Sequence, residues 1–221
     1  VLCGSGVNCL GSLMLMDHIV DLFPNPVEGN YHKATTADGK VEEFVVSPGG
    51  VPAAFVWKTV SDQFGKYSFI KVLSGEITPD TTLVNARTGD TEKLGRMYVM
   101  CGKKNTEVKV LSCGDIGAIG KMDRVKTGDT LCDPRKVVSL KQIPYPKACY
   151  SMAIAPKTRG QEEKVGTGLN RLNEEDPSFT VVNNPETKQL VISGTGDQQL
   201  DVLVSKLKSR FGVEAVLTTP K

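Results

Sequence analysis

Nucleotide hydrolysis is the first chemistry to test against this sequence, because several Gly-Lys pairs could close a phosphate-binding loop. Such a loop needs Ser or Thr directly after the lysine, since the backbone amides cradle the phosphates while the hydroxyl binds magnesium. None of the pairs is followed by Ser or Thr: Gly39-Lys40, Gly65-Lys66, Gly102-Lys103 and Gly120-Lys121. We therefore expect no phosphate-binding loop in these residues.

The histidines, acidic residues and cysteines form no pattern that indicates a catalytic or metal site. His18 and His32 fall in an expected helix and an expected loop, and the sequence has no Gly-x-Ser-x-Gly motif. The acidic runs 162–163 and 174–176 are typical of the solvated face of a helix. The six cysteines show neither Cys-x-x-Cys spacing nor a nearby histidine. We expect no catalytic residue and no metal ligand, and the scattered thiols fit a reducing cytoplasmic compartment.

Basic side chains gather at two places that could bind a polyanion. Arg96 lies close in sequence to Lys103 and Lys104, and Lys157 lies close to Arg159. The net charge is only +2, from 27 basic and 25 acidic residues, so the whole chain creates no field that attracts nucleic acid. Solvated surface is one interpretation of these clusters. The other is contact with RNA phosphates, which needs only a few positioned cations and no sequence readout.

Length and composition predict the number of folded domains that carry these side chains. A chain of 221 residues with 39% hydrophobic and 24% charged residues predicts two small folded domains and excludes a disordered or fibrous protein. The most apolar stretch, 10–23, is interrupted by polar residues and is too short to cross a membrane. The opening residues are not a signal peptide, and we expect the chain to be a piece of a longer protein.

The first 50 residues are expected to form a short terminal segment of strand, loop and helix, followed by a linker. Residues 1–27 predict a short strand at 1–3, a glycine-rich loop and a helix at 13–23 that Pro24 ends. The polar residues 28–50 contain turn-forming glycines and predict a linker.

Short strands without helices are expected from 51 to 135. Runs of β-branched and aromatic residues alternate there with turn signals such as 74–75 and 88–90. A closed antiparallel barrel is the arrangement that protects the edges of such short strands. We therefore predict a β-barrel.

The period of the sequence changes after a connector at 136–146. Residues 147–221 read strand, helix, strand, strand, helix, strand, with helices at 161–176 and 197–211. This βαββαβ order is the ferredoxin-like pattern of an α+β domain. The third strand, 189–192, has no aromatic side chain, so a base-stacking RNA surface is disfavoured on this sheet.

Short segments in both parts resemble a known family. Three resemble the β-barrel second domain of the translational GTPases: 69–75 (Phe-Ile-Lys-Val-Leu-Ser-Gly), 114–118 (Gly-Asp-Ile-Gly-Ala) and 127–132 (Thr-Gly-Asp-Thr-Leu-Cys). Three resemble the third domain of elongation factor G: 154–158 (Ile-Ala-Pro-Lys-Thr), 172–179 (Leu-Asn-Glu-Glu-Asp-Pro-Ser-Phe) and 192–196 (Ile-Ser-Gly-Thr-Gly). The resemblance covers nearly the whole chain.

The resemblance implies a role in translation. It likens residues 1–27 to the end of the GTPase domain, whose Ser-Ala loop contacts the guanine base; Ser5 matches that loop, and Gly6 departs from its alanine. It implies GTP and magnesium for the complete protein, with neither bound by these residues alone. The implied partners are small-subunit rRNA and ribosomal proteins, without DNA or a membrane. The clusters Arg96, Lys103, Lys104, Lys157 and Arg159 then become candidate ribosome contacts.

One segment departs from the family pattern. Residues 194–201 read Gly-Thr-Gly-Asp-Gln-Gln-Leu-Asp, where the family has Gly-Met-Gly-Glu-Leu-His-Leu-Glu, which indicates a divergent paralogue. We expect the central domains of an elongation factor G-like GTPase that couple GTP state to domain movement in translocation. The alternatives are a ribosome protection protein of tetracycline resistance, a release-factor-type GTPase, or a stand-alone RNA-binding or regulatory module without GTPase activity.

Overall fold

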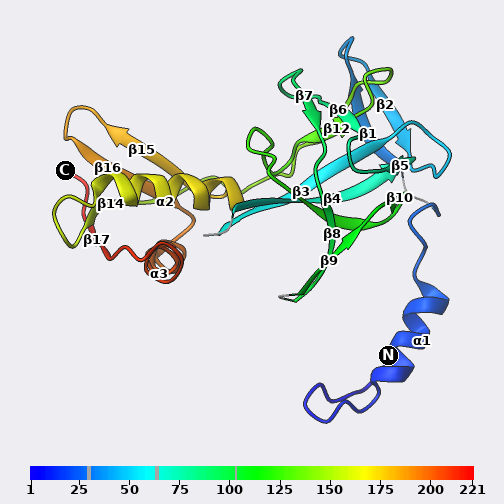
Figure 1. Cartoon of the computed structure of the whole chain (residues 1–221). Helices are drawn as coiled ribbons and strands as arrows, with labels where there is room; N and C mark the ends of the chain where they lie inside the picture. The colour runs from blue at the N-terminus through cyan, green and yellow to red at the C-terminus, as the bar shows by residue number, and fades with distance from the viewer. Residues whose placement is uncertain (29–30, 63–64, 103) are drawn as a thin grey trace.

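The chain folds into two bodies that lie side by side, with a helical arm extending from the first (Figure 1). The computed structural model describes residues 1–28, 31–62, 65–102 and 104–221. The first body is a β-barrel and the second is a ferredoxin-like domain, as the sequence predicts.

The barrel is a curved antiparallel sheet with a short two-stranded sheet at one side. Its strands are β3 (Ala53–Asp62), β4 (Gly65–Ser74), β5 (Glu76–Ile77), β6 (Thr82–Asn85), β7 (Thr91–Lys93), β8 (Met97–Cys101), β9 (Lys104–Val108), β10 (Leu111–Ser112), β11 (Ile116–Gly120) and β12 (Thr130–Cys132). The larger sheet has the order β7-β6-β12-β3-β4-β11-β8-β9, and β10 pairs with β5.

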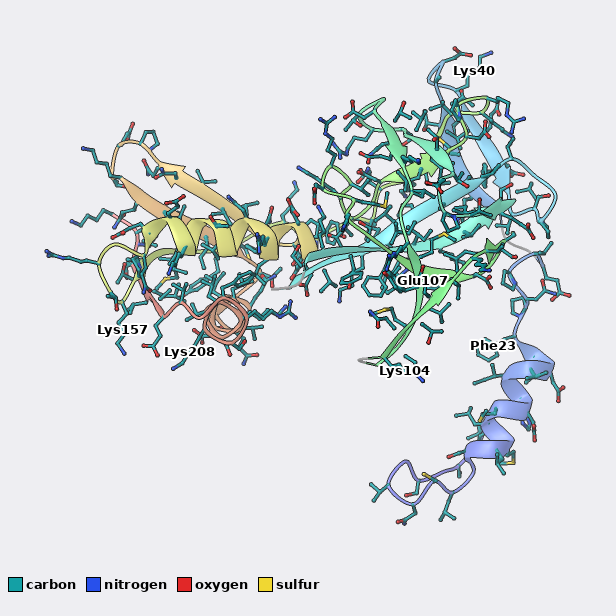
Figure 2. All side chains as sticks on the ribbon, in the orientation of Figure 1. Phe23, Lys40, Lys104, Glu107, Lys157 and Lys208 are labelled. Atoms are coloured by element: carbon teal, nitrogen blue, oxygen red, sulfur yellow. The ribbon has the colours of Figure 1, made fainter. Side chains whose placement is uncertain are left out.

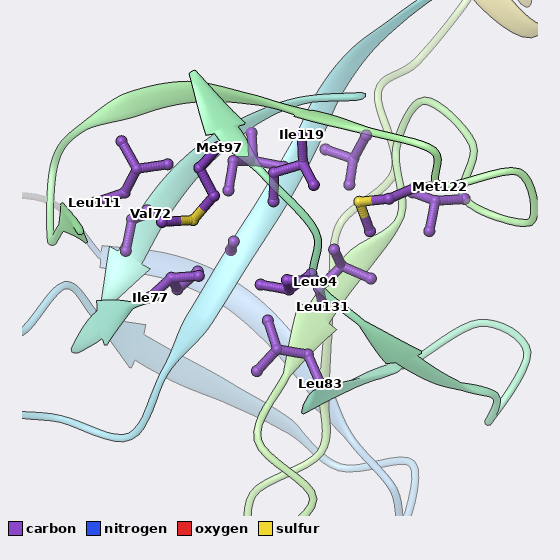
Figure 3. Close-up of a cluster of buried hydrophobic side chains, with 13 residues drawn as sticks. Val72, Ile77, Leu83, Leu94, Met97, Leu111, Ile119, Met122 and Leu131 are labelled. Atoms are coloured by element: carbon purple, nitrogen blue, oxygen red, sulfur yellow. The ribbon is translucent and has the colours of Figure 1, made fainter. Parts of the chain in front are cut away.

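The long strands β3 and β4 give the barrel an inner and an outer face. Val56 on β3, Ile70 on β4 and Ile119 on β11 are fully buried in one apolar cluster (Figure 3). Successive side chains of a strand lie on opposite faces, so their neighbours in sequence point outward. A bulge between Val56 and Lys58 places Trp57 in β3 as an extra residue. Full burial of each aliphatic side chain contributes about 1.5–3 kcal/mol.

The expected linker at 28–50 is wrong, because this segment contains two strands. They form a three-stranded sheet with part of the expected connector at 136–146: β1 (Tyr31–Thr36), β2 (Val41–Val45) and β13 (Val138–Leu140). Ala34, Phe44 and Leu140 are buried together against the side of the barrel. The few apolar residues of 28–50 thus share one face of a sheet. The many polar residues between them hide this pattern in the sequence.

The N-terminal segment is a loop followed by α1 (Ser12–Leu22). The strand expected at 1–3 is wrong: within the described residues, the pairing found there is a single bridge between Ser5 and Leu10. The helix expected after it is confirmed, but none of its residues is buried. Leu13 and Val20 are 78% and 80% exposed.

The ferredoxin-like domain packs two helices on one face of a four-stranded antiparallel sheet. Its elements are β14 (Tyr150–Pro156), α2 (Glu162–Glu175), β15 (Thr180–Asn184), β16 (Gln189–Gly194), α3 (Asp197–Phe211) and β17 (Ala215–Thr218), and the sheet order is β15-β16-β14-β17. Apolar residues at helical spacing on α2 and α3, such as Leu169 and Leu203, pack against Ile192 of the sheet. Gly212 ends α3 in the left-handed conformation at φ 66°, which favours glycine.

Candidate functional site

The C-terminal end of α2 is where the ferredoxin-like domain meets the barrel (Figure 1). The hydroxyls of Thr59 and Thr127 donate hydrogen bonds to the carbonyl oxygen of Glu174, at 2.6 and 3.0 Å. The last four carbonyls of a helix lack partners within the helix, so groups from outside must satisfy them. Thr59 is only 1% exposed, which shelters its bond from water. The barrel therefore caps a helix of the neighbouring domain.

Lys66 adds a charge to the same contact. Its ammonium lies 2.9 Å from Oε2 of Glu174 and donates to the carbonyl of Asp123 at 3.2 Å. Only 8% of the Lys66 side chain and 35% of the Glu174 side chain are exposed, so water and salt screen this pair less than a surface pair. A cation at a helix C-terminus also interacts favourably with the helix dipole. A cavity of about 290 Å³ beside the pair is lined partly by Ser61 and Arg171. We call Thr59, Lys66, Thr127 and Glu174 the junction.

An ion pair between a buried carboxylate and a partly exposed guanidinium lies beside the junction, with Asp129 two residues after Thr127. Asp129 is 2% exposed and accepts hydrogen bonds from Nε and Nη2 of Arg87, at 2.6 and 2.9 Å. The Asn85 amide and the backbone N–H of Lys126 complete its partners at 2.8 and 2.9 Å. Paired bonds from a guanidinium to a carboxylate fix geometry as well as charge. This network holds the loop that carries Thr127.

The surroundings of Asp129 keep it ionised. Burial alone raises the pKa of the Asp129 carboxyl, but the hydrogen bonds from Arg87, Lys126 and Asn85 and the charge of Arg87 hold it below its ordinary value. The same bond to Asp129 raises the pKa of the Arg87 guanidinium. The pair is therefore structural in character, with both groups charged.

Two family models match the two bodies that the junction connects. Residues 52–134 match the model described as elongation factor G domain 2, and residues 145–219 match that described as elongation factor G, domain III. The chain belongs to the elongation factor G-like family. A crystal structure of a protein from Thermus thermophilus aligns with 99% of the chain at 26% sequence identity and a TM-score of 0.77. The chain spans about 30% of that protein's length.

On the elongation factor G-like second domain, the expected basic residues lie along one hairpin. Arg96 precedes β8 and is 76% exposed, with Nη1 3.9 Å from Oε2 of Glu107. Lys104 is exposed at the start of β9, at the other end of the hairpin from Arg96 (Figure 2). Lys103, named with them in the sequence, lies outside the described residues. Both described cations are accessible to a polyanion.

On the elongation factor G-like third domain, Lys157 and Arg159 follow β14. The Lys157 ammonium lies 3.2 Å from Oε2 of Glu214, and Lys208 lies 2.7 Å from the other oxygen of that carboxylate. Hydrogen bonds from Lys208 and then Lys157 lower the pKa of Glu214. Arg159 is exposed in the loop before α2. Lys157 and Lys104 lie far apart, so the basic clusters stay separate (Figure 2).

The loop expected to face guanine is closed on itself. The N–H and C=O of Ser5 bond the C=O and N–H of Leu10, both at 3.1 Å, and the Asn8 N–H donates to the Ser5 hydroxyl. Gly6 is exposed with open space around its Cα. Within the described ranges, no three His, Cys, Asp or Glu side chains gather as metal ligands, and the sequence lacks a phosphate loop. That GTP and magnesium are held by the complete protein and not by these residues alone stays a prediction.

None of the helices in the described ranges has the length and apolar character needed to cross a bilayer.

The junction residues were missed by reasoning from the sequence. The run 174–176 was expected on a solvated helix face, and this is wrong for its first two residues. Glu174 pairs with Lys66, and the Glu175 side chain is only 8% exposed and pairs with Arg210 at 2.6 Å. The one available indication was the motif at 127–132, which the family resemblance singled out without a role.

Proposed function

We propose that this chain is the coupling portion of an elongation factor G-like GTPase that acts on the ribosome in translocation. In this proposal the barrel and the ferredoxin-like domain pass a rotation of the GTPase domain on to the small ribosomal subunit. The junction is the observation that carries it. Domain interfaces within a chain are commonly modest and polar, which lets domains move relative to one another in a defined way. The Thr59, Thr127 and Lys66 bonds to one helix end have this character.

The exposed apolar side chains of α1 support a further domain beside the barrel. Leu13, Val20 and Leu22 are 78%, 80% and 72% exposed on a helix without a buried residue in this chain. An apolar helix of this kind needs a partner surface to leave water. We propose that a GTPase domain covers it and holds the GTP and magnesium, with Ser5 and Gly6 at its guanine side. This arrangement disfavours a stand-alone RNA-binding module.

The proposed partners are small-subunit rRNA and ribosomal proteins in the cytoplasm. Arg96 and Lys104 on the barrel, and Lys157 and Arg159 on the ferredoxin-like domain, are the proposed phosphate contacts, together with Lys103. Lys157 already shares Glu214 with Lys208, so we expect it to contribute less than Arg159, which forms no ion pair within the described residues.

Binding to purified small ribosomal subunits, measured by co-sedimentation across a salt series, tests this proposal. Lys104→Glu and Arg159→Glu should each weaken binding, and each lost phosphate contact should flatten the log–log salt dependence by about 0.7–0.9 units. Lys40→Glu, in the exposed turn between β1 and β2, is the matched control and should bind as the parent chain does. Absence of binding at low salt, or equal weakening in the Lys40 variant, would contradict the proposal.

A further inference from the structure

The outer face of the barrel carries aromatic side chains that lie outside the inner core, and one of them, Phe55, packs against the apolar cluster of Phe44 and Leu140. The chain has seven Phe, five Tyr and one Trp. Five of these residues lie together on one outward-facing surface of the barrel, which marks that surface as a candidate binding site. The members of the cluster lie on β3, β4 and β8: Phe55, Trp57, Tyr67, Phe69 and Tyr98. We call this surface the aromatic face.

Strand register places these side chains on one face. Lys58, Phe69, Ala118 and Tyr98 are directly opposite one another across β3, β4, β11 and β8. Phe69 alternates with Ile70, which points into the core, so this row points outward. Ala118, which lies between Phe69 and Tyr98 in this row, is 0% exposed.

The aromatic rings are ordered by contacts with one another. The rings of Trp57 and Phe69 are 5.6 Å apart and inclined at 55°. Those of Tyr67 and Tyr98 are 6.2 Å apart in an edge-to-face arrangement. Trp57 remains 39% exposed, so its ring presents a free surface to a ligand.

One end of the aromatic face opens into a cavity that is lined by both apolar and cationic side chains. This cavity of about 320 Å³ is lined by Phe55, Leu73 and Leu140 and by the lysines Lys33, Lys71 and Lys141. Across the described chain, these lysines form no ion pair. Three free cations beside apolar groups suit a ligand that is anionic and carries flat rings.

The buried Nε2 atom of His32, at the same cavity, has no hydrogen-bond partner within the described residues. Burial and then the charge of Lys71 lower the pKa of the His32 imidazole. The imidazole therefore adds no positive charge at neutral pH to the three lysines of this cavity.

The opposite end of the aromatic face has a second basic hollow. A cavity of about 470 Å³ is lined by Tyr67 and Tyr98 and by Lys66, Arg96 and Lys121. Two acidic groups reduce the positive charge at this end of the aromatic face: Glu174 pairs with Lys66, and Glu107 lies 3.9 Å from Arg96. Cations therefore flank the aromatic face at both ends.

We propose that the aromatic face binds single-stranded RNA, with bases stacked on Trp57 and Phe69 and phosphates held by the three lysines of the first cavity and by Lys121 of the second. Aromatic side chains in a positively charged groove are the means by which barrels bind single strands without sequence preference. The unpaired lysines favour a polyanion over a protein partner, because lysine is depleted in protein–protein interfaces. The proposal goes beyond the ribosomal coupling role and does not depend on it, because it concerns the 221-residue chain and a short oligonucleotide.

The test uses fluorescein-labelled oligouridylate of about ten nucleotides, within the usual site sizes of such folds. We expect binding by fluorescence anisotropy and a change in Trp57 emission, which is assignable because the chain has one tryptophan. Trp57→Leu and Phe69→Leu should each weaken binding at least about fivefold. Lys71→Gln should reduce the log–log salt slope by about 0.7 units.

Matched variants keep the test specific. Tyr150→Leu, on β14 and also 39% exposed, should bind as the parent chain does. Unchanged circular dichroism and thermal midpoints establish that the Trp57 and Phe69 variants are folded. The proposal is overturned if the oligonucleotide does not bind, if a duplex of the same length binds as tightly, or if the folded Trp57 and Phe69 variants bind like the parent. If the aromatic face docks a protein instead, the oligonucleotide would not bind, even where the chain still binds ribosomal subunits.

Discussion

The barrel and the ferredoxin-like domain bury different kinds of side chain. The buried polar residues of the described chain all lie in the barrel: Thr59, Ser61, Ser68, Ser74, Asn85, Asp129 and Thr130. The core of the ferredoxin-like domain is apolar, with Phe179 and Leu169 fully buried. Directional bonds thus fix the loops of the barrel, while the second domain depends on shape and burial.

The largest expected effect on stability comes from a substitution in the apolar core of the ferredoxin-like domain. Phe179→Ala should lower the free energy of unfolding of the ferredoxin-like domain by about 3–5 kcal/mol, through lost burial and a residual cavity. Urea unfolding followed by far-ultraviolet circular dichroism reports helices α2 and α3, and Trp57 fluorescence reports the barrel. Val182→Ala, 57% exposed on β15, is the control and should change little. An equal shift of both signals would mean that the two bodies unfold as one.

The ion pair of the buried Asp129 with Arg87 should give the next largest effect, now in the barrel. Asp129→Asn leaves the Arg87 guanidinium without its counter-charge and should cost about 2–3 kcal/mol, less than a fully buried pair because Arg87 is 39% exposed. Trp57 fluorescence in urea measures it. Asp133→Asn is the matched control, because its partner Arg135 is 75% exposed. If both variants lose the same stability, the barrel does not depend on its buried polar network.

Acid should weaken the barrel through the same carboxylate. The pKa of Asp129 in the folded protein lies below its ordinary value of about 3.9. Its contribution is therefore fully present above about pH 4 and is lost as the pH falls through the folded-state pKa. The Trp57-reported urea midpoint should fall below pH 4 in the parent chain and fall less in Asp129→Asn. Identical pH profiles for the two proteins would remove Asp129 as the cause.

The junction should give the smallest effect. Lys66→Gln removes the partly sheltered charge pair with Glu174 and should cost about 0.5–1 kcal/mol. The expected result is a wider separation between the fluorescence and circular dichroism midpoints, because the two bodies lose part of their coupling. Lys93→Gln is the control, since its pair with Asp80 is 69% and 79% exposed. Unchanged separation would place the coupling in the Thr59 and Thr127 hydroxyls alone.

Local patterns predicted most of the fold. Val165, Leu169 and Leu172 recur at helical spacing, and they are the buried stripe of α2. The alternation in β4 likewise reflects its inner and outer faces. The sheet of β1, β2 and β13 escaped prediction because each strand offers few apolar residues and completes its buried face only with the others.

The site was less accessible to prediction for a different reason. The hydrogen bond between Thr59 and Glu174 joins residues 115 positions apart, and neither is unusual for its own element. A threonine on a strand and a glutamate on a helix gain their roles only when the two bodies meet. The described basic residues Arg96, Lys104, Lys157 and Arg159, by contrast, are exposed as expected, since a charged side chain that stays in water needs no partner.

The hydrogen bonds to the Glu174 carbonyl attach α2, and the domain packed around it, to the barrel at one end. The helix has 14 residues and is therefore about 21 Å long, anchored to the barrel at its C-terminal end. A tilt of about 10° at the anchor would displace the N-terminal end by about 4 Å. Arg159 lies just before the N-terminal end of α2, so a pivot of the whole domain at the two threonines would move this exposed guanidinium by about that distance.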